Sequence, residues 1–285
     1  MRRILRVALL SSGIASAQTA ITFAAKKEGG ERIKALSVHL GGGRLATIAV
    51  VGTDPAKAAL VSGEALNLLG HDPVTRMTIL QGPNKEQPVA SPRASSLGLQ
   101  PGDAVYLPSQ KRASRVVRWE NTFRGKILPV ALIRIHHPFD QPPLPGTPLA
   151  NAKGEVVAVC HEPAPKFGNG TFALPIEVVN RVEHDLKATG RVTTCWIGVT
   201  VNAINPVLAV EMVRPNSPGA AAGVKKGDIL LSVGPRKVST YAEARDAFYY
   251  MLAGEATDLT ILRGTKRLEL KVIPEVHPAY APADE

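Results

Sequence analysis

The sequence predicts a mostly β protein in two consecutive units, the first all-β and the second built from mixed strands and helices. Short apolar runs broken by Gly, Pro, Asn and Asp extend from about Ile33 to Ile176, which is typical of a β-sandwich or barrel. Glycine (25 residues) and proline (23 residues) are both frequent, and this favours many turns. From about Arg191 onward, strand patterns alternate with helical ones, which indicates a small α+β domain.

The first unit is expected to contain strands over residues 45–51, 77–80, 104–107, 127–135 and 155–159. A helix is expected over residues 177–188, because apolar residues recur there at helical spacing and Gly190 follows as a stop. The second unit is expected to have strands over 196–201, 208–213, 229–233 and 258–262, with helices over 218–222 and 240–252. Thr240 and Glu243 form a capping-box pattern at the start of the longer helix. The expected domains are 18–190 and 191–275, with a flexible tail over 276–285.

The first residues resemble an export signal. Arg2, Arg3 and Arg6 give a positive start, residues 7–14 are largely apolar, and residues 15–17 read Ala-Ser-Ala. Small residues at this spacing are read by signal peptidase, so we expect residues 1–17 to be removed by cleavage after Ala17. The segment is too short to span a bilayer, and a frayed apolar N-terminus is the alternative. Export would place the protein in the periplasm or outside the cell.

The charge and the cysteines restrict the partners only weakly. The formal net charge of +10 permits attraction to anionic surfaces. The densest basic stretch is 111–118, and Trp119 is the only aromatic residue near it, so the chain offers no stacking platform for bases and no nucleic acid partner is expected. Export allows a disulfide between Cys160 and Cys195, but two free thiols are an equal alternative.

The second unit carries a recognisable motif over residues 217–230, Ser-Pro-Gly-Ala-Ala-Ala-Gly-Val-Lys-Lys-Gly-Asp-Ile-Leu. Ser217 can cap a short helix that starts at Pro218, and Gly223 can take the left-handed conformation that ends it. Gly227 and Asp228 form the turn into the next strand. This stretch resembles the SPAxxAGLxxGDxI signature of PDZ domains.

A second motif in this unit is Trp196-Ile197-Gly198-Val199, which resembles the carboxylate-binding loop of PDZ domains in bacterial proteases. The resemblance implies that backbone N–H groups of this loop hold the terminal carboxylate of a peptide. The peptide would then add as a strand beside Val199, Thr200 and Val201. The other wall of the groove is expected to come from the helix, and the alternative for these helical residues is core packing. The candidate wall residues are Ala244, Phe248 and Met251.

Two stretches of the first unit resemble the last strands of HtrA/Deg-type serine proteases. Residues 148–159 look like that family's GGPLxNxxGxVVGI, and residues 170–176 look like its GFAIPI. A third stretch, 101–106, resembles xGDxV. The resemblance implies a chymotrypsin-like double β-barrel followed by an α+β PDZ domain.

The family's catalytic residues are missing at the matching positions. Its His stands in LTxxHVV, its Asp in DPxxDLAVL and its Ser in GNSGGPL; this chain has Ala49, Arg76 and Pro145 there. Ala has no titratable group, Arg would repel an imidazolium, and Pro has neither a hydroxyl nor an N–H for an oxyanion hole. The resemblance therefore implies a catalytically inactive member.

Other constellations are weaker candidates for catalysis. Thr147 lies near the lost Ser, with His136, His137 and Asp140 upstream, but adjacent histidines on a strand point to opposite faces. The same argument weakens a Cys160–His161 pair. The spacing of the three upstream residues matches no metal-ligand motif, so neither a metal nor another cofactor is expected.

The sequence thus favours an exported, non-catalytic protease homologue that binds peptide or protein C-termini, as in protein quality control. The competing hypothesis is an active HtrA-like serine endopeptidase with a rearranged site. The sequence also leaves open whether the protein binds an active partner protease and whether it forms a homo-oligomer.

Overall fold

The computed structural model describes residues 18–27, 29–83, 89–108, 110, 112–161, 170–204 and 207–278. The expected signal segment and residues 279–285 of the expected tail lie outside these ranges. The chain divides into two compact units, one of Met1–Trp119 and Leu132–Val179, the other of Glu120–Ala131 and Asn180–Glu285. This division falls within a helix, earlier in the chain than the expected boundary between residues 190 and 191.

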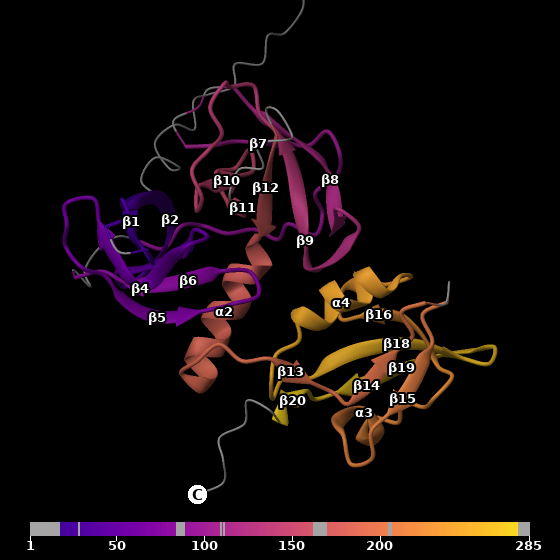
Figure 1. Cartoon of the computed structure of the whole chain (residues 1–285). Helices are drawn as coiled ribbons and strands as arrows, with labels where there is room; N and C mark the ends of the chain where they lie inside the picture. The colour runs from indigo at the N-terminus through magenta and orange to yellow at the C-terminus, as the bar shows by residue number, and fades with distance from the viewer. Residues whose placement is uncertain are drawn as a thin grey trace, which may run out of the picture. The chain divides into compact units, whose positions relative to one another are not determined.

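The first six strands form one antiparallel sheet in the order β4-β1-β2-β3-β6-β5 (indigo to purple in Figure 1). A bridge between Ala59 and Ala65, and a hydrogen bond of 3.0 Å from the Leu66 N–H to the Ala58 carbonyl, join its two outer strands. The sheet therefore closes like a barrel around buried side chains such as Phe23. Its strands are β1 (Gln18–Ala25), β2 (Ile33–Gly41), β3 (Arg44–Ile48), β4 (Thr53–Leu60), β5 (Asn67–His71) and β6 (Met77–Gln81).

Strand β1 has no counterpart among the expected strands. It pairs with β2 on one side and with β4 on the other, and Ile21, Thr22 and Phe23 are all buried. Ile21, Thr22 and Phe23 alternate between apolar and polar residues, but this run is shorter than the roughly four to eight residues that indicate a strand in a sequence.

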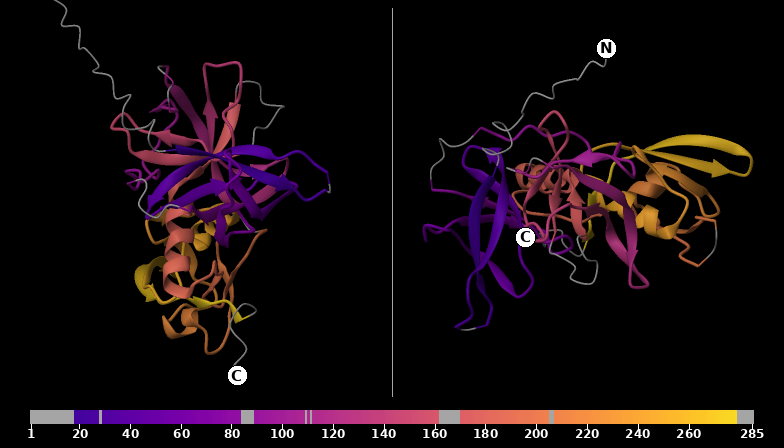
Figure 2. Two further views of the ribbon diagram at one scale, coloured as in Figure 1. Left: turned by 90° about the vertical axis from the view of Figure 1, so that its left-hand side faces the viewer. Right: turned by 90° about the horizontal axis from the view of Figure 1, so that it is seen from above.

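The next six strands form a second sheet in the order β10-β11-β12-β9-β8-β7 (magenta to salmon in Figure 2). Tyr106 and Ala150 exchange backbone hydrogen bonds of 2.8 and 2.9 Å, which join its two ends. The expected mostly β, barrel-like fold is confirmed. The strands are β7 (Ala104–Val105), β8 (Ser114–Phe123), β9 (Lys126–His136), β10 (Pro148–Ala150), β11 (Val156–Cys160) and β12 (Gly170–Pro175).

Helix α2 (Ile176–Thr189) follows β12 and agrees with the expected helix over 177–188. Its apolar stripe is fully buried at Ile176, Val179 and Val182. Over the described part of the chain, no helix is both long and apolar enough to cross a membrane.

Among the described residues after α2, the second unit has three small sheets and two helices. The largest sheet has the order β17-β16-β18-β19, while β14 pairs with β15 and β13 with β20. The helices are α3 (Pro218–Ala221) and α4 (Tyr241–Tyr249). The strands are β13 (Cys195–Trp196), β14 (Val199–Val201), β15 (Val210–Val213), β16 (Ile229–Val233), β17 (Arg236–Lys237), β18 (Thr257–Arg263), β19 (Lys266–Val272) and β20 (Glu275–Val276).

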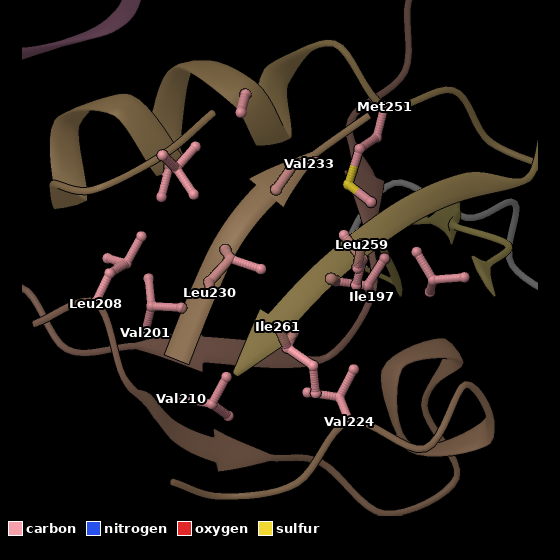
Figure 3. Close-up of a cluster of buried hydrophobic side chains, with 14 residues drawn as sticks. Ile197, Val201, Leu208, Val210, Val224, Leu230, Val233, Met251, Leu259 and Ile261 are labelled. Atoms are coloured by element: carbon pink, nitrogen blue, oxygen red, sulfur yellow. The ribbon is translucent and has the colours of Figure 1, made fainter. Parts of the chain in front are cut away.

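The core of the second unit is aliphatic, as Figure 3 shows. Leu230 and Ile261 of the central strands meet Val201 and Val210 of the β14–β15 pair. Beyond α4, the Cys195 thiol lies 3.0 Å from the Met251 carbonyl oxygen. The C-terminal end of α4 therefore lies close to the segment that leads into β14.

The caps of both helices agree with the sequence patterns. Ser217 accepts a hydrogen bond from the Ala220 N–H, and Thr240 with Glu243 forms the predicted capping box. Helix α4 ends at Tyr249, earlier than the expected residue 252, and the expected strand over 196–201 is split by a bend at Gly198. Val276, the first residue of the expected tail, pairs with Cys195 in β13.

Candidate functional site

The three positions aligned with the protease triad belong to different segments of the first unit. Ala49 follows β3, is 3% exposed and belongs to the core of the first sheet. Its N–H donates a hydrogen bond of 2.9 Å to the carbonyl of Arg76, which precedes β6. The structure therefore places these two positions side by side.

Arg76 ends a tight turn that begins at Asp72. Its backbone has φ 61°, a left-handed conformation that is unusual for Arg, and its N–H donates to the Asp72 carbonyl at 2.7 Å. The Asp72 carboxylate holds the turn by accepting from the Val74 N–H at 3.0 Å and from the Thr75 hydroxyl at 2.6 Å. The guanidinium of Arg76 reaches the second sheet, where its Nη2 lies 2.9 Å from Nε2 of His161.

Pro145 lies in the loop before β10. Its carbonyl accepts a hydrogen bond of 2.8 Å from the N–H of Leu36 in the first sheet. The next residue, Gly146, has φ 83°, and a Cβ there would lie 1.8 Å from the Leu36 carbonyl oxygen. Only glycine fits this close approach. The loop is thus held against the first sheet by its backbone.

A chain of contacts connects the Pro145 loop back to Arg76. The Gly146 N–H donates to the Cys160 carbonyl and the Cys160 N–H donates to the Thr147 carbonyl, both at 2.8 Å. Cys160 is followed directly by His161, the residue that meets Arg76. Backbone contacts thus place Ala49 beside Arg76, and the Arg76 side chain reaches His161, next to the segment that bonds to the Pro145 loop. We refer to this set of contacts as the centre of the first unit.

The other polar groups of this centre are already engaged or buried. The Thr147 hydroxyl donates to the Leu144 carbonyl at 2.6 Å. The Cys160 thiol is fully buried, which raises its pKa far above the ordinary value and keeps it protonated. His161 faces a guanidinium, which can only donate, so its imidazole is held there as an acceptor. The loop is rich in proline, and Pro143 and Pro145 are among the residues that have no backbone N–H to donate.

The upstream candidates do not join this centre as a cluster. His136 is exposed at the end of β9, whereas His137 is 1% exposed and stacks on Phe139 with ring centroids 5.3 Å apart. Asp140 is exposed. In the described ranges, no three or more His, Cys, Asp or Glu side chains gather in a way that could hold a metal ion. Both Cys160 and Cys195 are free thiols.

The candidate peptide groove lies in the second unit, beside β14. Apart from its pairing with β15, β14 has no neighbour among the described strands, so one edge of it is open. Thr200 is exposed, Val199 is half-buried, and Val201 belongs to the core. An open edge of this kind can accept an additional strand.

The loop before β14 is held from behind by α3 and its cap. The Gly219 N–H donates to the Ile197 carbonyl and the Arg214 N–H donates to the Gly198 carbonyl, both at 2.8 Å. Gly198 has φ 69°, and a Cβ there would lie 2.3 Å from the Cβ of Ser217. Within the described residues, the N–H groups of Ile197 and Gly198 donate to no backbone acceptor. The loop thus presents two free backbone donors, which is what a carboxylate requires.

The expected wall residues on the helix differ in their burial. Ala244 (0% exposed) and Met251 (4%) belong to the core, whereas Phe248 is only partly buried. Tyr241, seven residues before Phe248, is also partly buried against the core. It was not among the expected wall residues, although its helical spacing from Phe248 indicates the same face of the helix. Trp196 is half-buried and meets the His277 ring edge to face at 6.4 Å.

Comparison with known proteins gives the fold of both units. The family model for the PDZ domain matches residues 195–273. The HtrA-type protease AlgW with tripeptide has a TM-score of 0.62 at 21% identity, covering 94% of this chain and 96% of that chain. The serine endoprotease from Yersinia pestis has a TM-score of 0.51 at 20% identity, covering 93% and 96%.

Curated relatives match a part of the chain. The probable periplasmic serine endoprotease DegP-like of Ectopseudomonas mendocina is 31% identical over 142 residues, 45% of this chain and 30% of the relative. Its counterpart in Marinomonas sp. is 30% identical over 148 residues, 47% of this chain and 32% of the relative. The chain therefore matches less than a third of the length of each of these relatives.

Proposed function

We propose that this homologue of HtrA-type serine endoproteases, with its C-terminal PDZ domain, is a non-catalytic protein that binds the free C-termini of peptides or proteins. The observation that carries the proposal is the open edge of β14 directly after a loop with two free N–H donors, those of Ile197 and Gly198. The loop receives the terminal carboxylate and the ligand adds to β14 as a strand. The barrel unit acts as a scaffold.

The non-catalytic half of the proposal is supported by what surrounds the centre of the first unit. The position of the base is a core alanine, Ala49, and the position of its orienting carboxylate is a cation, Arg76. An oxyanion hole needs the N–H of the nucleophile and that of the residue two positions before it. Those positions are Pro145 and Pro143, which have none.

The activity test uses the full chain with an unfolded substrate such as casein, together with a serine-directed fluorophosphonate probe. We expect neither turnover nor labelling. The competing hypothesis, an active serine endopeptidase, is favoured by the names of the curated relatives. Labelling of one defined residue, lost when that residue is substituted, would establish the competing hypothesis.

The binding test compares free-acid and amidated versions of peptides with an apolar last residue, by fluorescence polarisation. A single short strand and one pocket should give an affinity of about micromolar, roughly −8 kcal/mol. Amidation should weaken binding sharply because it removes the charge that the loop receives. Equal affinity for both versions would show that the groove does not read a carboxylate.

The matched variants are Gly198→Val and Gly254→Val. Both glycines have positive φ, 69° and 81°, so both substitutions strain the backbone. Only at Gly198 does an added Cβ meet another group, since nothing lies within 4 Å at Gly254. Loss of peptide binding is expected for Gly198→Val alone.

Export is part of the same proposal. The predicted cleavage after Ala17 leaves β1 intact, because β1 begins at Gln18, and the curated relatives are named periplasmic. Mass spectrometry of protein recovered from the periplasm or the medium should give Gln18 as the first residue. An intact Met1 in that fraction would contradict the cleavage.

A further inference from the structure

Helix α4 has three faces with different surroundings. Ala244 and Ala247 are buried in the core. On one flank, Asp246 lies 3.4 Å from Arg236, whose guanidinium stacks on the Tyr250 ring at 3.6 Å beside a cavity of about 320 Å³. The charge of Arg236 is therefore already compensated on that side.

The other flank of α4 is formed by Tyr241, Arg245 and Phe248. These residues follow the spacing i, i+4 and i+7, so they form one stripe along the helix. Tyr241 and Phe248 are partly buried against the same core that Val199 of β14 contacts. Since the opposite flank faces Arg236, this stripe is the flank of α4 left for a ligand strand that adds to the open edge of β14.

Arg245 places a free positive charge on this wall. It is exposed, and within the described residues it has no acidic partner. The acidic residues next to it in sequence are engaged elsewhere: Glu243 accepts from Ser239 and Thr240, and Asp246 pairs with Arg236. An anionic ligand group would thus meet no competing acid on α4.

The direction of the helix sets the ligand position that Arg245 can meet. The C-terminal end of α4 lies beside the loop segment, because the Cys195 thiol contacts the Met251 carbonyl. Phe248 is therefore the stripe residue nearest the carboxylate, and Arg245 lies about 4.5 Å further along the axis. A ligand strand advances about 3.3 Å per residue and turns every second side chain towards the helix. The final side chain meets Phe248, and the third from the end meets Arg245.

We propose that the groove selects C-termini with Asp or Glu at the third position from the end and an apolar final residue, and that Arg245 reads the acidic side chain. This inference rests on the proposed function, since it names the ligand class of the same groove. The net charge of +10 favours acidic partners in the same direction.

The test uses the full chain and two labelled free-acid peptides that differ only in Glu or Gln at the third position from the end. An exposed ion pair contributes only weakly, so the Glu peptide should bind about three-fold more tightly. This preference should vanish in Arg245→Gln, persist in Arg245→Lys, and shrink at about 1 M salt. Arg267→Gln is the matched control, because Arg267 is an exposed cation on β19 whose loss changes the net charge equally.

The outcomes separate the two proposals. A Glu preference that is lost in Arg245→Gln and kept in Arg267→Gln supports the inference. Equal binding of both free-acid peptides by the wild-type chain, or a preference that survives Arg245→Gln, overturns the inference while the proposed function stands. Failure of every free-acid peptide to bind overturns the proposed function as well.

Discussion

Arg76 shows how one residue can be kept in a conformation that its type disfavours. Its left-handed backbone costs about 1 kcal/mol for an ordinary L-residue, and Asp or Asn would occupy it more readily. The turn is nevertheless fixed by the Asp72 carboxylate, and the side chain reaches His161 across the centre. The contact between its side chain and His161 therefore accounts for an arginine here better than its backbone preference does.

Asp228 makes contacts in the structure beyond the turn that its sequence motif predicts. The Gly227-Asp228 pair was predicted only as a turn, but the Asp228 carboxylate is 1% exposed and accepts two hydrogen bonds from Arg263, at 2.7 and 2.8 Å. Burial alone would raise its pKa, yet the bonds from Arg263 and from the Lys225 N–H hold the pKa below its ordinary value. Arg263 lies 35 residues away in sequence, so no local pattern could reveal the pair.

We predict that Asp228→Asn lowers the free energy of unfolding by about 2–3 kcal/mol, because a charged hydrogen-bond pair loses its acceptor charge. Asp258→Asn is the control: its partner Lys271 and Asp258 itself are 65% and 71% exposed, so the cost should stay below about 0.5 kcal/mol. Since the folded pKa of Asp228 is lowered, its contribution is complete above the ordinary Asp pKa and is lost as pH falls. Urea unfolding of both variants decides this, and equal costs would contradict it.

At the scale of elements, the short helix α3 positions the carboxylate-binding loop. Gly219 of α3 bonds to Ile197, and a Cβ on Gly219 would lie 2.5 Å from Cγ2 of Val199 and 2.7 Å from the Ile197 carbonyl oxygen. In an open helix, replacing Gly by Ala stabilises by about 1 kcal/mol. Here the added methyl group must displace the loop, so the steric clash outweighs this gain and the substitution should destabilise the protein.

Gly219→Ala should therefore lower stability by about 1–3 kcal/mol and weaken binding of free-acid peptides. Gly98→Ala is a suitable control, because a Cβ at Gly98 meets nothing within 4 Å. Thermal unfolding and fluorescence polarisation measure the two effects. A Gly219→Ala chain that binds peptide like the wild type would show that α3 does not position the loop.

The elements also show where sequence reasoning reaches its limit. Caps and turns, such as Thr240 with Glu243, depend on neighbours within four residues and were predicted correctly. Residues 196–199 were expected both as a loop and as the start of a strand, and the close approach of Ser217 to Gly198 could not be predicted because Ser217 is distant in sequence. Ala244 and Phe248 share a helical spacing, and only the packing of α4 separates the buried one from the one on the wall.

At the scale of the whole molecule, stability should depend on two histidines, the buried His137 and the half-buried His71. His137 and His71 both have lowered pKa values, in each case mainly because burial disfavours the charged form. The unfolded chain therefore binds protons more readily than the folded one, so stability is constant above the ordinary His pKa of about 6.5 and falls as pH drops below it. Thermal unfolding of the first unit should show a lower midpoint at about pH 5 than at about pH 8. His137→Phe, which keeps a ring against Phe139, should reduce this loss, whereas the exposed neighbour variant His136→Gln should retain it.

The most demanding prediction concerns what the centre of the first unit lacks. The variant Ala49→His/Arg76→Asp/Pro145→Ser restores every side chain of a triad at the three aligned positions. It also restores one N–H, that of residue 145, but the second oxyanion donor stays absent at Pro143. Loss of one such donor costs about 10²–10³ in kcat, so this variant should react with a fluorophosphonate only slowly.

Adding Pro143→Gly should accelerate labelling about 100-fold, because glycine supplies both the N–H and the backbone freedom to aim it. Pro92→Gly is the control for proline removal elsewhere in the same unit, and it should leave the rate unchanged. If the triple variant is labelled but Pro143→Gly gives no acceleration, the missing N–H is not what limits this centre, and the burial of residue 49 in the core is the remaining structural cause.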